Sequence, residues 1–151
     1  MKQLRSVALL ITALLIGVIG CWDFGFGVDE ETTMPTPSQV NRARAEMYLK
    51  NTANITALGY KLAGSGIDDA IWFKFQTDAT DLAQVFDTTV VDPTRFTENV
   101  NLTTLKEVEW WDVKGKNLFG GQVALPNARF MAVGAEKTQD GYIIYIFWHA
   151  T

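Results

Sequence analysis

The chain has 151 residues, of which 13 are basic and 17 acidic, and its formal net charge is −4 at pH 7. The basic residues are scattered singly and form no patch that would bind phosphates, so we expect no nucleic acid as partner. Hydrophobic residues make up 48% of the chain. This length and composition predict one domain with a single core.

The first 21 residues combine a positive start, an apolar run and a short ending. Lys2 and Arg5 precede residues 7–19, which are mostly apolar, and the segment ends in Val18-Ile19-Gly20-Cys21. A membrane span needs about 20 apolar residues, so this run is too short for a comfortable span. It does have the length of a signal-peptide core.

The ending Val18-Ile19-Gly20-Cys21 resembles the lipobox of bacterial lipoprotein signal peptides. The resemblance covers residues 1–21 and implies cleavage before Cys21, with acylation of its thiol and new amino group by fatty acids such as palmitate. Two or more acyl chains hold a protein stably at a membrane. It thus implies a lipoprotein at the cell envelope, facing the periplasm. Trp22, in place of an Asp, favours the outer membrane over the inner one. The alternatives are a plain cleaved signal, an uncleaved anchor or a buried helix.

Cys21 is the only cysteine, so its acylation leaves the mature chain without a disulfide. We predict a signal peptide over residues 1–20, the lipidated cysteine and a flexible tether over 21–37, and one domain over 38–151. The tether is rich in Gly, Pro and acidic residues. Its aromatic residues Trp22, Phe24 and Phe26 rest among the lipid headgroups, are ordinary tether residues or dock on the domain.

A helix is predicted to begin near Ser38, with Thr36 or Ser38 as its cap, and to end before Gly59. Residues 53–62 fit either the end of this helix or the start of a strand. Alternation predicts a strand over Ile71–Thr77, with Phe73 and Phe75 on one face and Trp72 on the other.

A short helix capped by Asp78 and a helical turn after Asp92 are expected next, followed by a loop over 97–105. The short helix would bury Leu82, Val85 and Phe86.

The last third of the chain favours strands. Residues 107–113 alternate like a strand, 114–121 read as a loop, and strands are predicted over 128–135 and 142–149 with a turn at Asp140-Gly141. The last strand is apolar on both faces, which indicates either a central strand covered on both sides or a strand whose second face meets a partner. We therefore predict an α+β fold with an antiparallel sheet of four to five strands and two or three helices on one face.

The sequence contains no motif that names a reaction. Ser65 lies outside any nucleophile elbow, and a triad with Asp68 or Asp69 and His149 is a weak hypothesis. His149 is the only histidine, so we expect no metal and no cofactor. The Gly-rich residues 114–121 lack the ending of a phosphate-binding loop.

Acidic residues cluster twice and suggest an enzymatic alternative. The clusters are Asp68-Asp69 and, further on, Glu107, Glu109 and Asp112. A pair of carboxylates can hydrolyse glycans, but neighbouring acids are most often simply solvated, and neither cluster has the spacing of a calcium loop. We assign no catalytic residue.

The aromatic residues give a second candidate site. Trp72 and Trp111 are predicted to share one sheet face, which is either an exposed binding surface or part of the core. The leading hypothesis is a non-enzymatic module that binds an envelope protein or small ligand. The alternatives are a glycan hydrolase and a structural subunit of an envelope complex.

Overall fold

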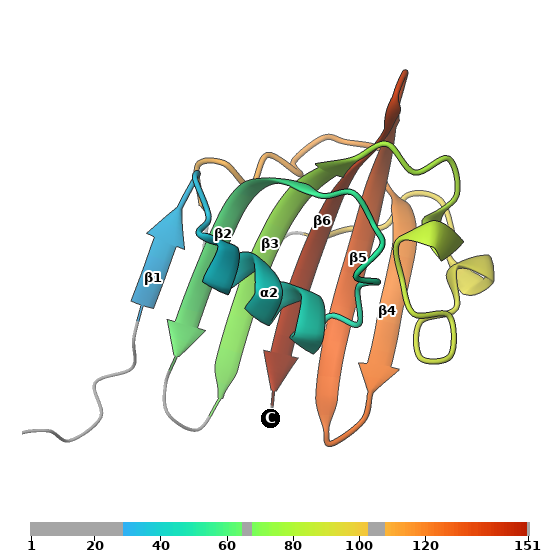
Figure 1. Ribbon diagram of the computed structural model, residues 1–151. Coiled ribbons are helices and arrows are strands. Elements are labelled where there is room, and N and C mark those ends of the chain that lie inside the picture. Colours follow the sequence, from blue (N-terminus) through green and yellow to red (C-terminus); the bar gives the residue numbers. More distant parts are fainter. Residues whose placement is uncertain (1–28, 65–67, 103–107, 151) are drawn as a thin grey trace, which may run out of the picture.

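The computed structural model describes residues 29–64, 68–102 and 108–150. Figure 1 shows one antiparallel sheet with a helix across its front face. The sheet has the strand order β1-β2-β3-β6-β5-β4. Its strands are β1 (Asp29–Thr32), β2 (Thr56–Gly64), β3 (Asp69–Thr77), β4 (Phe119–Leu125), β5 (Arg129–Thr138) and β6 (Gly141–Ala150).

Helix α2 (Pro37–Glu46) covers the front face and begins as the sequence predicts. The Thr36 side chain accepts a hydrogen bond from the Gln39 backbone N–H, and the Gln39 side chain accepts one from the Thr36 backbone N–H. This reciprocal capping box satisfies two N–H groups that lack partners within the helix. Ala43 and, just after the helix, Met47 are completely buried.

The two central strands, β3 and β6, bury side chains on both faces. Phe73 and Phe75 of β3 belong to the front core, whereas Trp72 belongs to a separate back core. The prediction of opposite orientations for these residues is confirmed. β6 lies between β3 and β5, which also confirms that the last strand is central.

In the described part of the chain, the back face is covered by irregular segments and not by helices. We call residues 97–102 and 108–118 the back-face segment. Its apolar side chains pack on Trp72 and Tyr145. The buried members that it contributes are Leu102, Val108, Trp111 and Leu118.

The predicted α+β class with two or three helices is wrong, because the fold is mainly β. In the part of the chain that the structure describes, α2 is the single α-helix, accompanied by the 3-10 turns η1 (Leu82–Gln84) and η2 (Pro93–Arg95). Asp81, not the predicted Asp78, caps η1, whereas Asp92 caps η2 as expected. Residues 88–91 are four consecutive β-branched residues before Asp92-Pro93, a sequence with low helix propensity.

Two strands lie where the sequence predicted none. β1 pairs with β2 from Asp29 onward, so the predicted tether over 21–37 cannot extend to residue 37. β4 begins inside the predicted loop over 114–121. Conversely, residues 108–113 form a turn and irregular chain instead of the predicted strand. The apolar side chains of the alternating pattern, Val108 and Trp111, are buried against the back face of the sheet.

The two ends of the sheet differ in what they carry. The lower end in Figure 1 holds the start of β1, the β4–β5 turn and the end of β6, whereas the β5–β6 turn lies at the upper end. Among the described residues, no helix is long and apolar enough to cross a membrane.

Candidate functional site

The two tryptophans predicted to form a binding surface are buried beneath the back-face segment. Trp72 is 5% exposed and Trp111 is 7% exposed. The Trp72 ring packs against Phe147 at 4.8 Å between centroids. The Trp111 indole N–H donates a hydrogen bond of 3.3 Å to the Leu102 carbonyl. The structure therefore brings both residues into one core, where they offer little surface to a ligand.

A charged cluster fastens the back-face segment to the sheet. Lys74 of β3 donates to the Asp112 carboxylate at 2.6 Å, and the buried Tyr145 hydroxyl donates to the same oxygen at 3.0 Å. Lys116 donates to Tyr145 at 2.9 Å and to Glu136 at 2.6 Å. Two cations and two anions thus surround one buried hydroxyl, and each side-chain charge has an opposite partner.

These contacts shift the titration of the cluster. Burial alone would raise the pKa of Asp112, but hydrogen bonds from Lys74 and Tyr145 outweigh it and lower the pKa to about 2. Burial raises the pKa of Tyr145 to about 12, with Asp112 adding to the rise and Lys116 opposing it. The pKa of Lys116 is raised, since hydrogen bonds to Glu136 and Tyr145 outweigh its burial. None of these shifts moves a pKa toward neutral pH, so the cluster is poorly suited to acid–base catalysis. It is better suited to holding the back-face segment on the sheet, and we call Lys74, Asp112, Lys116, Glu136 and Tyr145 the clasp.

An open hollow lies beside this clasp, at the upper end of β1. We call it the Trp110 hollow. It has a volume of about 620 Å³ and is lined by Glu31, Thr32, Thr33, Glu109 and Trp110. Two carboxylates, two hydroxyls and an aromatic ring therefore meet at one place. Glu31 forms an ion pair of 2.7 Å with Lys61.

The position of Trp110 is set by a glycine in β2. A side chain at Gly59 would collide with the Trp110 ring, which lies directly on the strand there. The register of β2 against β3 also shifts between Ala57 and Gly59. The Trp110 indole nitrogen is buried and has no hydrogen-bond partner among the described residues. Such unpaired donors are rare in folded proteins and call for an explanation.

A second hollow, at the end of α2, is less suited to binding. It has a volume of about 510 Å³ and is lined in part by Arg44 and Lys50. Arg44 already donates to the carbonyls of Lys50 and Ala53, and Lys50 donates to that of Ala83. Both cations thus hold the chain that follows α2. Among the described residues, no group of three or more His, Cys, Asp or Glu residues is placed to hold a metal ion.

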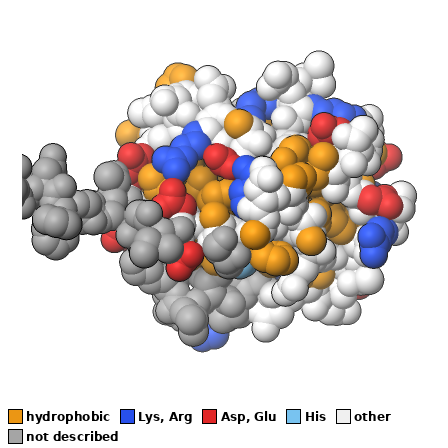
Figure 2. All heavy atoms as spheres, turned by 90° about the horizontal axis from the view of Figure 1, so that it is seen from below, with side chains coloured by type: hydrophobic (Ala, Val, Ile, Leu, Met, Phe, Trp, Pro, Cys, Tyr) orange, Lys and Arg blue, Asp and Glu red, His pale blue; other side chains and the backbone are white. Residues whose placement is uncertain are grey.

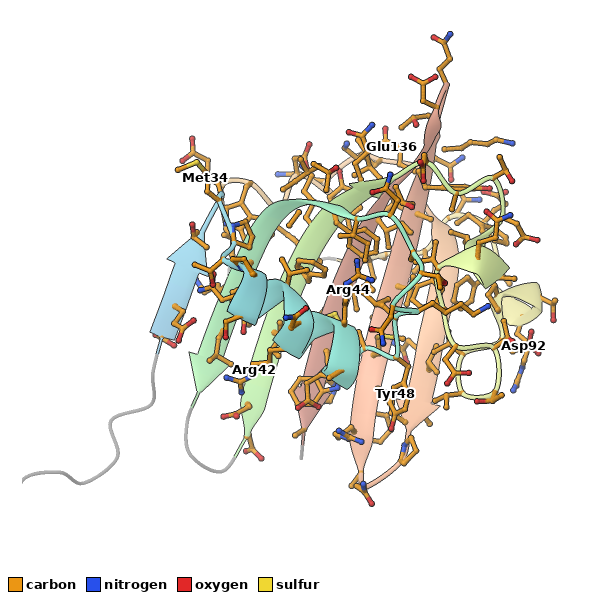
Figure 3. All side chains as sticks on the ribbon, in the orientation of Figure 1. Met34, Arg42, Arg44, Tyr48, Asp92 and Glu136 are labelled. Atoms are coloured by element: carbon orange, nitrogen blue, oxygen red, sulfur yellow. The ribbon has the colours of Figure 1, made fainter. Side chains whose placement is uncertain are left out.

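Two other candidate residues from the sequence, Asp69 and His149, lie in the neighbouring strands β3 and β6 but on opposite faces of the sheet. Asp69 forms an ion pair of 3.4 Å with Arg42 on α2. Arg42 is labelled in Figure 3. His149 lies at the lower end, stacked on Phe130 at 5.4 Å and on Phe147 at 5.5 Å between ring centroids. Cys21, Ser65 and Glu107 lie outside the described residues.

The acidic clusters of the sequence are divided by the fold. Glu109 lines the Trp110 hollow, whereas Asp112, three residues later, belongs to the clasp. Sequence reasoning missed the hollow because Glu31 and Thr32 come from a strand that it did not predict. The available signal was Gly59 within an otherwise apolar stretch, since glycine in a strand often marks the close approach of another group.

Comparison with protein-family models found no match for this chain. Comparisons with characterised proteins and with solved structures likewise found no significant similarity.

Proposed function

We propose that this protein is a membrane-anchored lipoprotein of the bacterial cell envelope whose β-sheet domain is a binding module. The observation that carries the proposal is the lipobox-like Val18-Ile19-Gly20-Cys21 after a charged start and an apolar run. Acylated Cys21 would hold the protein at a membrane, with the outer membrane favoured and the domain facing the periplasm.

The placement of the carboxylates favours binding over catalysis. Asp112 and Asp69 are both held in ion pairs. The pKa of Asp112 is lowered to about 2, so this carboxyl is ionised at neutral pH and cannot act as a general acid there. The Trp110 hollow offers the best remaining site. Its volume lies within the range of ligand pockets, and it combines an aromatic ring with polar groups.

The chemistry of the hollow favours a cationic ligand group. Lys61 neutralises one of its two carboxylates, which leaves the lining with a net negative charge. An aromatic ring beside a carboxylate attracts a Lys or Arg side chain or another ammonium group. The chain after Cys21 carries 11 basic and 17 acidic residues, a net charge of −6 that also favours a cationic partner.

Processing at Cys21 tests the anchor. The lipoprotein hypothesis predicts that globomycin or Cys21→Ser blocks maturation, and that Cys21→Ser releases or mislocates the protein. Membrane fractionation and the mass of the N-terminal peptide measure both effects. Normal maturation of Cys21→Ser, with unchanged membrane location, would contradict the proposal.

Photo-crosslinking in cells tests the hollow. A crosslinking amino acid at exposed Thr33, which lines the hollow, should capture a partner that the same group at exposed Thr80 does not. Trp110→Ala and Glu109→Gln should weaken this capture, whereas Glu98→Gln, a change of the same charge elsewhere on the surface, should not. Equal capture from Thr33 and Thr80 would argue against a binding site in the hollow.

A glycan hydrolase is a second candidate, because Glu31 and Glu109 line the same hollow as Trp110. Release of sugars from peptidoglycan or oligosaccharides that is lost in Glu109→Gln and kept in Glu98→Gln would favour it. Detergent extraction followed by crosslinking tests a third candidate, a structural subunit of an envelope complex. A protein neighbour that stays bound through the extraction, and whose capture does not depend on Trp110 or Glu109, would favour it.

A further inference from the structure

One row of paired residues crosses the back face of the sheet at its lower end. Each member pairs with the next across the antiparallel strands, so all their side chains point to the same face. The row consists of Asp29, Ala63, Ala70, His149, Phe130 and Ala124. It starts at the first described residue of the chain and ends at the opposite edge of the sheet.

The far half of this row carries one exposed aromatic ring, which stacks on half-buried rings. Phe130 is 44% exposed and stacks on His149, which stacks on Phe147. We call these three residues the aromatic patch. Figure 2, which views this end from below, shows hydrophobic side chains gathered at the surface. Arg129, beside the patch in sequence, points to the front face, where it bonds Glu46 and Tyr48.

The proposed anchor is close enough to bring the patch to a membrane. Residues 22–28 separate Cys21 from Asp29. A fully extended chain of this length would span about 28 Å between the two residues. Neighbouring strands lie about 4.8 Å apart, so the four steps from β1 to β5 place Phe130 about 19 Å from Asp29 along the row. The chain therefore enters the domain at the end that carries the patch.

The upper end provides a natural contrast. Met34 is 84% exposed, and it and Phe130 are the two exposed large hydrophobic residues among those described. Met34 lies near the top of the view in Figure 3, in the connection from β1 to α2. Phe130 and Thr138 lie near the lower and upper ends of β5, eight residues apart. At about 3.4 Å per residue, the two ends are separated by about 27 Å. One apolar residue thus lies at each end, and the patch is on the end next to the anchor.

We propose that the aromatic patch rests on the lipid headgroup region of the membrane to which Cys21 is anchored. This inference rests on the proposed lipid anchor. Aromatic rings settle favourably at the membrane interface, and a tether turns weak docking into an intramolecular contact with a high effective concentration. The docked orientation points the Trp110 hollow, at the upper end, away from the bilayer.

The patch itself contains no Lys or Arg residue, so apolar contact and not charge drives the docking. Attraction between exposed basic residues and anionic lipids weakens as salt screens it. Docking of the patch should therefore persist when the salt concentration rises and should not require anionic lipid.

Depth measurements on the lipidated full-length product test the proposal. Acylation of Cys21 leaves an introduced cysteine as the single thiol, which we would label with an environment-sensitive fluorophore at Ala124, Gln122 or Gln139. All three side chains are exposed; Ala124 belongs to the row, Gln122 lies higher on β4, and Gln139 lies in the upper turn. In phosphatidylcholine vesicles with spin-labelled lipids, quenching should be strongest at Ala124, weaker at Gln122 and at background at Gln139.

Phe130→Ser in this system should remove the quenching at Ala124, and Phe130→Leu should restore it. The matched control Met34→Ser changes the exposed apolar residue at the other end and should leave the quenching intact. Thermal unfolding of each variant verifies that the domain is folded, and Phe130→Leu keeps the test decisive if Phe130→Ser is unstable.

Each result separates the inference from the proposed anchor. Missing acylation in the mass of the N-terminal peptide would defeat the anchor proposal. An acylated, vesicle-bound protein with equal quenching at Ala124 and Gln139 would overturn the docking alone. A blue-shifted label at Ala124 that spin-labelled lipid does not quench would indicate contact with protein, such as a second copy, and would also overturn it.

Discussion

The two faces of the sheet are covered in different ways. On the front face, a capped helix packs on a continuous apolar core in which Phe73, Phe75 and Ile146 are 0% exposed. On the back face, an irregular segment packs through Trp111 and is fastened by charges around Tyr145. Ion pairs also join α2 to the sheet on the front face, between Arg42 and Asp69 and between Glu46 and Arg129. The charges of the back cover instead gather around the buried Tyr145 hydroxyl.

This difference explains why the candidate site lies on the back. The helix on the front face satisfies most of its backbone hydrogen bonds within itself. The hollow at its end is occupied by Arg44 and Lys50, which already bond to backbone carbonyls. The back-face segment leaves the Trp110 hollow at its margin, beside β1. Binding residues often lie on such connecting segments positioned by a rigid sheet.

The largest expected effect is on the front core. Phe73→Ala removes a fully buried ring that packs on Phe75 at 5.1 Å between centroids and edge-on to Tyr60. We expect the free energy of unfolding to fall by about 3–5 kcal/mol, because the change leaves a cavity in a central strand. Urea unfolding measures the loss. Phe130→Ala, at a 44% exposed position, is the control and should lose much less. A similar loss in both variants would refute a front core centred on Phe73.

Gly59→Ala should loosen the back cover while it spares the front. The added methyl group collides with the Trp110 ring, so the ring has to move. We expect a loss of about 1–3 kcal/mol, typical of overpacking, and a red shift of tryptophan fluorescence. Ala57→Gly in the same strand controls for the general effect of changing a small residue there. An unchanged fluorescence spectrum in Gly59→Ala would contradict the described packing of Trp110.

Strong acid should weaken the back cover. The pKa of Asp112 is about 2 in the folded protein against an ordinary value of 3.8, so its contribution is complete above about pH 3.8 and is lost as the pH falls toward 2. Its side chain is 51% exposed, and solvent screening limits the loss to about 1 kcal/mol.

Asp112→Asn should lower the free energy of unfolding at neutral pH. It should also make that free energy depend less on pH between about pH 2 and pH 3.8. Stability measured by urea unfolding between pH 2 and pH 6 tests this. Asp69→Asn, which removes an ion pair with an exposed Arg42, is the matched control and should resemble the parent protein. A parallel pH dependence in the parent and Asp112→Asn would show that another group titrates.

The smallest expected effect concerns the cap of the front helix. Thr36→Ala removes the side-chain acceptor of the Gln39 N–H and should cost about 1 kcal/mol. Thr36→Ser should retain most of the stability, and exposed Ser38→Ala, two residues on, is a control that leaves the cap in place. Thermal unfolding resolves these differences. Equal stability of Thr36→Ala and Ser38→Ala would mean that the cap contributes nothing.

Much of the regular structure follows from local patterns. The cap before α2, the alternation in β3 and the apolar last strand with its Asp140-Gly141 turn were all predictable. Each depends on residues a few positions apart. The strands β1 and β4 were not predicted, because DEET is acidic and FGGQVAL contains two glycines. Their conformation is decided by pairing with β2 and β5.

The candidate site shows the same division. The sequence singled out Glu109 and Asp112 as one acidic cluster, but the turns over residues 108–113 send them to different places. It also proposed a surface of Trp72 and Trp111, which the fold buries. Alternation assigns a residue to a face, but it does not say what covers that face.

The sequence by itself determined the helix cap and the two-faced central strands, because these depend on short-range order and composition. Only the tertiary structure decided that six strands form one sheet, that a loop covers its back, and that Glu31, Glu109 and Trp110 meet. Glu31 lies far from Glu109 and Trp110 in the chain. Their meeting depends on strand pairing and on close packing at Gly59, which no local pattern specifies.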